Sequence, residues 1–162
     1  MNDLFAPADV SWTSVSVKLA ALRRLSCGIA VGLVGLIVSA LLWILAGALY
    51  GVLAVLVALA SYGWAWYLIG RNQRSWKYAE REDELLITHG VMFRELVVVP
   101  YGRMQFVDVT AGPLERAFGL ATVELHTATP ATDATIPGLT PDEAARLRDR
   151  LSALGQAQAW GL

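Results

Sequence analysis

One run of uncharged residues limits what this chain can fold into more than any other feature. From Leu25 through Gly70 the sequence has no Asp, Glu, Lys, Arg or His, and every charged residue lies outside that run. A helix needs about 20 apolar residues to cross a bilayer, so the run has room for two spans and a tight turn. A soluble helix would need a polar face, which neither half of the run provides. The sequence therefore predicts an integral membrane protein.

The two spans are expected at about 25–46 and 48–69, with Gly47 in a very short turn between them. Basic residues flank the pair on both sides, while the turn itself carries no charge. They are Lys18, Arg23 and Arg24 before the first span and Arg71, Arg74 and Lys77 after the second. Because cytoplasmic flanks are enriched in Lys and Arg, this pattern places both termini in the cytoplasm.

Small residues recur at helical spacing along one stripe of each expected span. The stripes consist of Gly28, Gly32, Gly35 and Ser39 in the first span, and Gly51, Ala54, Ala58 and Ser61 in the second. Small side chains let helix backbones approach closely in lipid, where no hydrophobic drive joins them. The stripes predict packing of the hairpin on itself, or contact with another protomer or a partner membrane protein.

The rest of the chain divides into an N-terminal segment, residues 1–24, and a soluble domain, residues 71–162. Within residues 11–22, Val15, Leu19 and Leu22 share one helical face, which favours a short helix lying at the membrane interface. After residue 71 the pattern becomes one of short strands and turns. Strands are expected near 76–81, 85–87, 91–99, 104–109, 120–128 and 135–136, with a helical turn at 113–118 and a Thr-, Pro- and Ala-rich loop before the last strand.

A C-terminal helix is expected to close the soluble domain. Thr140 is a good N-cap, Pro141 suits the first helical position, and Glu143 completes the pattern of a capping box. Apolar residues follow at helical spacing as far as Leu154, and Gly155 is expected to end the helix. The predicted fold class is therefore α+β: a transmembrane hairpin followed by a small antiparallel β domain capped by a helix.

Four stretches of the soluble part resemble a known family. They read WKYAEREDELLITHG, VVVPYGRMQFVDV, GPLERAFGLATVELHTA and IPGL, in that order. Together with the preceding helix pair they resemble the YdbS-like bacterial membrane proteins, which carry a bacterial pleckstrin-homology-like (PH) domain, over roughly residues 15–155. The resemblance implies a bent antiparallel sheet with a C-terminal helix and a location in the bacterial inner membrane. It supplies no catalytic residues.

Motifs typical of catalysis, metal binding or nucleic-acid binding are absent from the sequence. No GxSxG, P-loop, HExxH or GxGxxG pattern occurs, and the two histidines are 37 residues apart. Residues 71–162 carry ten Lys and Arg against twelve Asp and Glu, which gives no basic surface for nucleic acid. We therefore expect no enzymatic activity, cofactor or metal.

Two functions remain open from the sequence. The first is a membrane-anchored, non-enzymatic PH-like interaction module at the cytoplasmic face, which binds a membrane-protein partner or associates with itself. The alternative is an anionic-lipid-binding protein, or one concerned with envelope stress or resistance to antimicrobial peptides. Partner or headgroup contacts are expected from five basic residues, Arg71, Arg74, Lys77, Arg103 and Arg116, although Arg103 could instead pair with Glu115 or Asp108.

Overall fold

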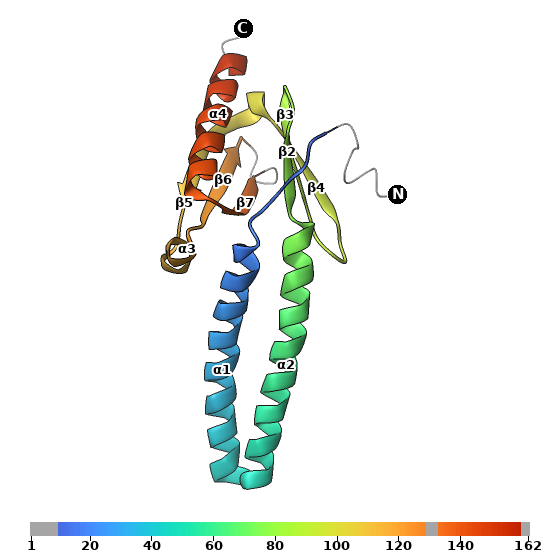
Figure 1. Cartoon of the computed structure of the whole chain (residues 1–162), viewed down its shortest axis with the longest axis vertical. Helices are drawn as coiled ribbons and strands as arrows, with labels where there is room; N and C mark the ends of the chain where they lie inside the picture. The colour runs from blue at the N-terminus through green and yellow to red at the C-terminus, as the bar shows by residue number, and fades with distance from the viewer. Residues whose placement is uncertain (1–9, 129–132, 160–162) are drawn as a thin grey trace. The chain divides into compact units, whose positions relative to one another are not determined.

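The computed structural model describes residues 10–128 and 133–159 (Figure 1). It divides into two compact units, one formed by Ala20–Arg71 and the other by the chain on both sides of that segment. Residues 1–9 of the expected N-terminal segment and residues 129–132 of the expected loop lie outside the described residues.

The first unit is a hairpin of two long helices. Helix α1 (Lys18–Ala46) and helix α2 (Ala48–Ser75) are joined by Gly47, whose φ of +102° favours glycine. Their most apolar windows have mean hydropathies of 2.7 and 1.9, and neither window is buried within the protein. The two predicted apolar helices are confirmed. Both extend beyond the uncharged run because their basic flanks continue in helical conformation.

Sheet A of the soluble domain contains strands from both sides of the hairpin. Its order is β1 (Thr13–Ser14), β2 (Lys77–Glu80), β3 (Glu84–His89) and β4 (Glu95–Pro100), and all neighbours are antiparallel. Strand β1 precedes α1 in the chain, whereas β2 follows α2. The helical hairpin is therefore an insertion between the first two strands of the soluble domain.

The segment before the hairpin differs from the expected interfacial helix over 11–22. Thr13 pairs with Tyr78 in the sheet, and α1 begins only at Lys18. Val15 and Leu19, which were expected to face the membrane interface, are only 4% and 2% exposed. Their burial in the soluble domain removes the apolar face that an interfacial helix would need.

Sheet B consists of β5 (Met104–Thr110), β6 (Ala121–Thr127) and β7 (Ala134–Leu139) in that order, all antiparallel. A short 3-10 turn, η1 (Tyr101–Arg103), leads from β4 into β5. The predicted helical turn is present as α3 (Pro113–Phe118) between β5 and β6, and it ends at Gly119 with a φ of 64°. Gly112, the N-cap residue of α3, has an ordinary φ of −66°.

Helix α4 (Pro141–Ala159) closes the domain and passes the expected stop at Gly155. The Glu143 backbone N–H donates to Thr140 Oγ1 at 3.3 Å, which is the first half of the predicted capping box. The Glu143 carboxylate instead accepts a hydrogen bond from the Tyr78 hydroxyl at 2.7 Å. Helix α4 thereby binds β2 through a side chain expected to cap the helix itself.

The core lies between the two sheets and α4. Its fully buried side chains include Tyr78, Leu85, Ile87, Val99, Tyr101, Val123, Leu125, Ile136, Leu139, Leu147 and Leu151. Tyr101 is 0% exposed, and its hydroxyl donates to the Arg81 carbonyl at 3.0 Å. The predicted α+β architecture is confirmed: an apolar helical hairpin with an antiparallel sheet domain capped by a C-terminal helix.

Candidate functional site

Three of the five predicted basic contact residues lie where α2 leads into β2. Arg71 and Arg74 are exposed in the last turns of α2, and Lys77 is the half-buried first residue of β2. The Arg71 guanidinium lies 5.7 Å from the ring centre of Tyr67, one helical turn earlier. These three residues form a short basic segment directly after the uncharged run.

The other two predicted contacts, Arg103 and Arg116, are exposed at opposite ends of β5. The seven residues of β5 span about 23 Å. Among the described residues Arg103 forms an ion pair with neither Glu115 nor Asp108. The Glu115 carboxylate instead accepts from the Gly112 N–H and the Thr122 hydroxyl, both at 2.8 Å. The structure therefore does not assemble all five basic residues into one site.

The small-residue stripes contain several close contacts between α1 and α2. A Cβ at Gly35 would lie 2.9 Å from the Ala58 Cβ, and the Ser39 hydroxyl donates to the Gly51 carbonyl at 3.0 Å. A Cβ at Gly32, in contrast, would meet nothing within 4 Å. These contacts favour packing of α1 against α2 along much of the two stripes. Gly32 makes no close contact of this kind.

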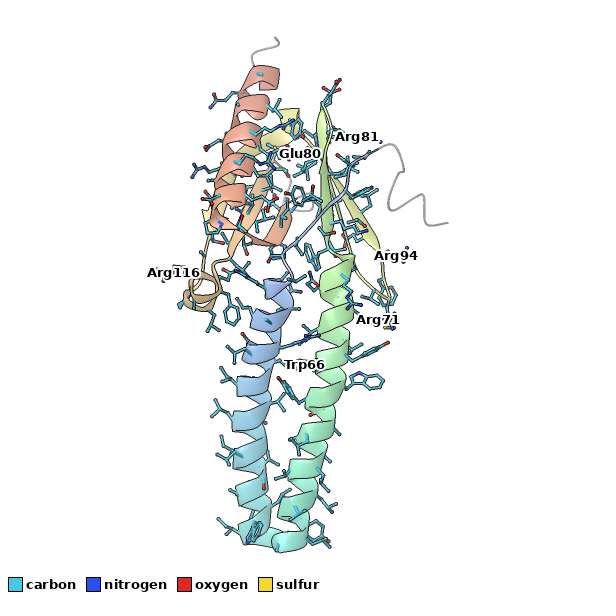
Figure 2. All side chains as sticks on the ribbon, viewed as in Figure 1. Trp66, Arg71, Glu80, Arg81, Arg94 and Arg116 are labelled. Carbon is cyan, nitrogen blue, oxygen red and sulfur yellow. The ribbon has the colours of Figure 1, made fainter. Side chains whose placement is uncertain are left out.

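A cation–π contact links the two helices near their charged ends. The Arg24 guanidinium lies 4.2 Å from the ring centre of Trp66, whose side chain projects from α2 (Figure 2). The Tyr62 hydroxyl donates to the Arg24 carbonyl at 3.3 Å. Arg24 therefore contributes to the hairpin as well as to its basic flank.

Glu80 (labelled in Figure 2) holds α4 to sheet A through Arg146 and Arg150. Its two carboxylate oxygens lie 3.1 Å from Arg146 Nη2 and 3.0 Å from Arg150 Nε. The Glu80 side chain is only 15% exposed, while the two arginine side chains are 51% and 56% exposed. The interaction is a structural link between β2 and α4, and the sequence pattern did not reveal it.

Perturbed pKa values in the soluble domain have structural causes. Burial raises the pKa of Tyr101 to about 12, and burial together with the bond to Glu143 raises the pKa of Tyr78. A hydrogen bond from the Thr127 backbone N–H at 2.8 Å lowers the pKa of Asp133. The hydrogen bond to Glu80 raises the pKa of Arg146. Tyr78, Tyr101 and Arg146 all lie within the electrostatic influence of Glu80, whereas Asp133 lies beside Thr127 and His126. None of the four groups forms part of a nucleophile–base pair among the described residues.

A groove runs between β5 and α4. It has a volume of about 370 Å³ and is lined by Met104, Gln105, Phe106 and Val107 from β5 and by Leu151, Ser152, Gly155 and Gln156 from α4. None of these eight residues is charged. Within residues 10–128 and 133–159, strand β5 pairs only with β6, so its other edge has backbone groups outside the sheet. The groove therefore combines an open strand edge with apolar and neutral polar side chains.

The turn between β3 and β4 carries the two most exposed large apolar side chains in the described part of the soluble domain. Met92 and Phe93 are each 86% exposed. The turn starts at Gly90, whose φ is +102°, and a Cβ there would lie on the Phe93 carbonyl oxygen. We call residues 90–94 the β3–β4 tip.

The groove and the tip were both missed by the reasoning from sequence. The groove depends on how α4 packs against β5, and the spacing of residues along either element does not reveal that packing. The tip falls within the strand expected over 91–99, of which the structure keeps only the part from Glu95 onward. The sequence signal there is Gly90, followed closely by two adjacent large apolar residues.

Comparison with known proteins agrees with this architecture. Residues 14–155 match the model of the family described as "Bacterial PH domain". The chain is 38% identical over 106 residues to the UPF0699 transmembrane protein YdbS of Bacillus subtilis (strain 168), and the match spans 65% of each chain, just under two thirds of that relative's length. No solved structure matches. The family match begins in β1 and ends in α4, so it includes the inserted hairpin. This chain belongs to the bacterial PH domain family, and it carries two helices that are long and apolar enough to cross a membrane.

Proposed function

We propose that this protein is a membrane-anchored, non-enzymatic module whose PH domain binds an extended segment of a partner membrane protein in the groove between β5 and α4. The observation that carries the proposal is the open edge of β5 beside that groove. An extended peptide can add to such an edge through main-chain hydrogen bonds, while neighbouring pockets receive alternate side chains.

The lining of the groove indicates the chemistry of the segment. Phe106 is 52% exposed and stacks on His126 with ring centres 4.5 Å apart, which provides a held aromatic surface. Ser152 and Gln156 supply neutral polar groups from α4. Because no lining residue is charged, the groove suits an uncharged, partly apolar segment better than a phosphorylated peptide or a lipid headgroup.

The membrane anchor supports a partner in the same bilayer. Confinement to one membrane raises the effective concentration of two proteins, so a groove of modest affinity can still be occupied. The partner can also be a second copy of this chain, which would make the protein a homo-oligomer. The mass of the captured complex distinguishes these two outcomes.

The proposal places both termini and the PH domain in the cytoplasm. Basic residues flank both helices, and the Gly47 turn has no charge. This orientation can be tested with single introduced cysteines after Cys27, the one cysteine of the sequence, is replaced by alanine. A cysteine introduced at Glu82 should react with a membrane-impermeant maleimide in inverted vesicles but not in intact spheroplasts, whereas labelling in intact spheroplasts would reverse the orientation.

Two matched substitutions on α4 test the groove. Ser152→Trp fills the space beside β5, while Ala153→Trp adds the same side chain at the next exposed position, which does not line the groove. The full chain is purified in mild detergent from its native membrane. The proposal expects a co-purifying membrane protein, or a second copy of the chain, with the wild type and with Ala153→Trp but not with Ser152→Trp. Equal recovery with both variants would exclude the groove as the binding site.

A further inference from the structure

Among the described residues, the most exposed large apolar side chains of the soluble domain lie next to the residues where α1 begins and α2 ends. Val17, immediately before α1, is 77% exposed, and Met92 and Phe93 at the β3–β4 tip are each 86% exposed. The other exposed large apolar side chains of this domain are between 36% and 52% exposed, namely Val98, Phe106, Val109 and Leu114. Such concentration of apolar surface usually marks a protein or membrane contact.

The β3–β4 tip is bonded to the last residue of α2. The Gly90 backbone N–H donates to Ser75 Oγ at 3.0 Å. The Trp76 and His89 rings stack with their centres 4.4 Å apart. These contacts lie within the soluble domain and keep the tip beside the residue where α2 ends.

The length of α2 gives the depth of that residue in the membrane. Its 28 residues extend for about 42 Å. The hydrocarbon core of a bilayer is about 30 Å thick, and about 40–45 Å when the headgroup regions are included. A helix that starts at Ala48, directly after the uncharged turn, therefore ends at Ser75 in the headgroup region. The tip bonded to Ser75 is consequently at the level of the lipid headgroups.

The tip has a conformation that presents its side chains outward. A Cβ at Gly90 would overlap the Phe93 carbonyl oxygen, so the turn is closed tightly enough to need glycine. Arg74 and Lys77, close by along the chain, supply positive charge at the same level. Apolar side chains flanked by basic ones are typical of segments that lie in an anionic membrane interface.

We propose that Met92 and Phe93 insert into the boundary between headgroups and acyl chains of the bilayer that the protein already spans. The tip then forms a second attachment of the PH domain to the membrane, in addition to the helical hairpin. This attachment does not depend on what occupies the groove between β5 and α4. A bilayer is favoured over a protein partner because the tip is bonded to a residue at headgroup depth.

Fluorescent probes on the full chain test this proposal. In a Cys27→Ala background, single cysteines replace Met92, Phe93 or the control Glu82, which lies in the turn at the opposite end of β2 and β3. Each variant carries an environment-sensitive fluorophore and is placed in nanodiscs of phosphatidylcholine and phosphatidylglycerol. Because Met92 and Phe93 are almost fully exposed, their replacement leaves the core intact.

The expected result is a blue-shifted emission at the two tip positions that is strongly quenched by lipids carrying a nitroxide near the headgroup. The probe at Glu82 should keep the emission of an aqueous dye and resist quenching. Tip probes that behave like the Glu82 probe would overturn the proposal. So would a blue shift without quenching by nitroxide lipids, because it would mean that protein rather than lipid covers the tip.

Discussion

The link between Glu80 and α4 leads to a quantitative prediction about stability. Either Arg146 or Arg150 alone still neutralises the Glu80 carboxylate, whose side chain is 15% exposed. Because the arginines are about half exposed, removal of one should cost no more than about 1 kcal/mol. Removal of both leaves a largely buried carboxylate without a cation. Loss of the partner of a fully buried charge costs about 3–5 kcal/mol, so we expect about 3 kcal/mol here.

The substitutions Arg146→Met and Arg150→Met test this because methionine keeps much of the aliphatic length and a similar helix propensity. Hydrogen exchange of the α4 amides, measured on the full chain in detergent micelles, gives the free energy of opening of that helix. We expect the double variant to lose about 1 kcal/mol more than the two single variants together.

A third variant separates charge from packing. Glu80→Gln added to the double variant removes the stranded carboxylate, so it should restore part of the protection of α4. Strictly additive losses, together with no recovery on adding Glu80→Gln, would refute the view that the two arginines share one partly buried charge.

Three further predictions concern other parts of the fold. Gly138→Ala should lower the free energy of unfolding of the soluble domain by at least about 1–2 kcal/mol, because the φ of residue 138 is +75° and the new Cβ would lie 2.9 Å from Leu19. Chemical denaturation measures this loss of free energy. Gly35→Leu should lower the thermal midpoint of the full chain in nanodiscs by crowding the facing helix, whereas Gly32→Leu, at a position with nothing within 4 Å, should not. Burial raises the pKa of Tyr101 from 10.0 to about 12, so its protonated hydroxyl stabilises the wild-type protein below pH 10, and this stability is lost as the pH rises through about 12. Tyr101→Phe should therefore flatten this alkaline limb, the fall in the free energy of unfolding at high pH, in a pH series of denaturation curves.

Each of these predictions has a result that would count against it. Unchanged stability of Gly138→Ala would mean that the segment before the hairpin is not held in the soluble domain as described. Equal effects of the two leucine substitutions in α1 would remove the distinction between packed and unpacked glycines. Because the pKa of Tyr78 is also raised, part of the alkaline limb should remain in Tyr101→Phe, but a limb as steep as in the wild type would assign it to groups other than Tyr101.

The sequence predicted the helical hairpin well because few environments accept 46 consecutive residues without charge. It also predicted most strands, since their alternation and turns are local signals. The role of the segment before α1 was mistaken for a physical reason. Val15 and Leu19 have the spacing of an interfacial helix, but Val15 is buried as the backbone leaves strand β1, and Leu19 contacts Gly138, over a hundred residues later.

The candidate sites were harder to predict than the fold. Basic residues were identified by type, but only the structure shows that Arg103 and Arg116 lie at opposite ends of β5. The groove depends on the packing of α4 against a strand edge, and the depth of the tip depends on the bond between Gly90 and Ser75. Such sites arise from contacts between distant segments, which spacing along a single sequence does not reveal.

Site-specific photo-crosslinking in the native membrane tests the central claim most directly. A photoreactive phenylalanine analogue replaces Phe106 in the groove, and the same analogue at Glu82 serves as the control. We predict a defined covalent adduct from Phe106 that is absent from Glu82, that disappears when Ser152→Trp fills the groove, and that persists with Ala153→Trp. No adduct beyond that of the control, or an adduct that survives Ser152→Trp, would contradict the assignment of the groove between β5 and α4 as the binding site.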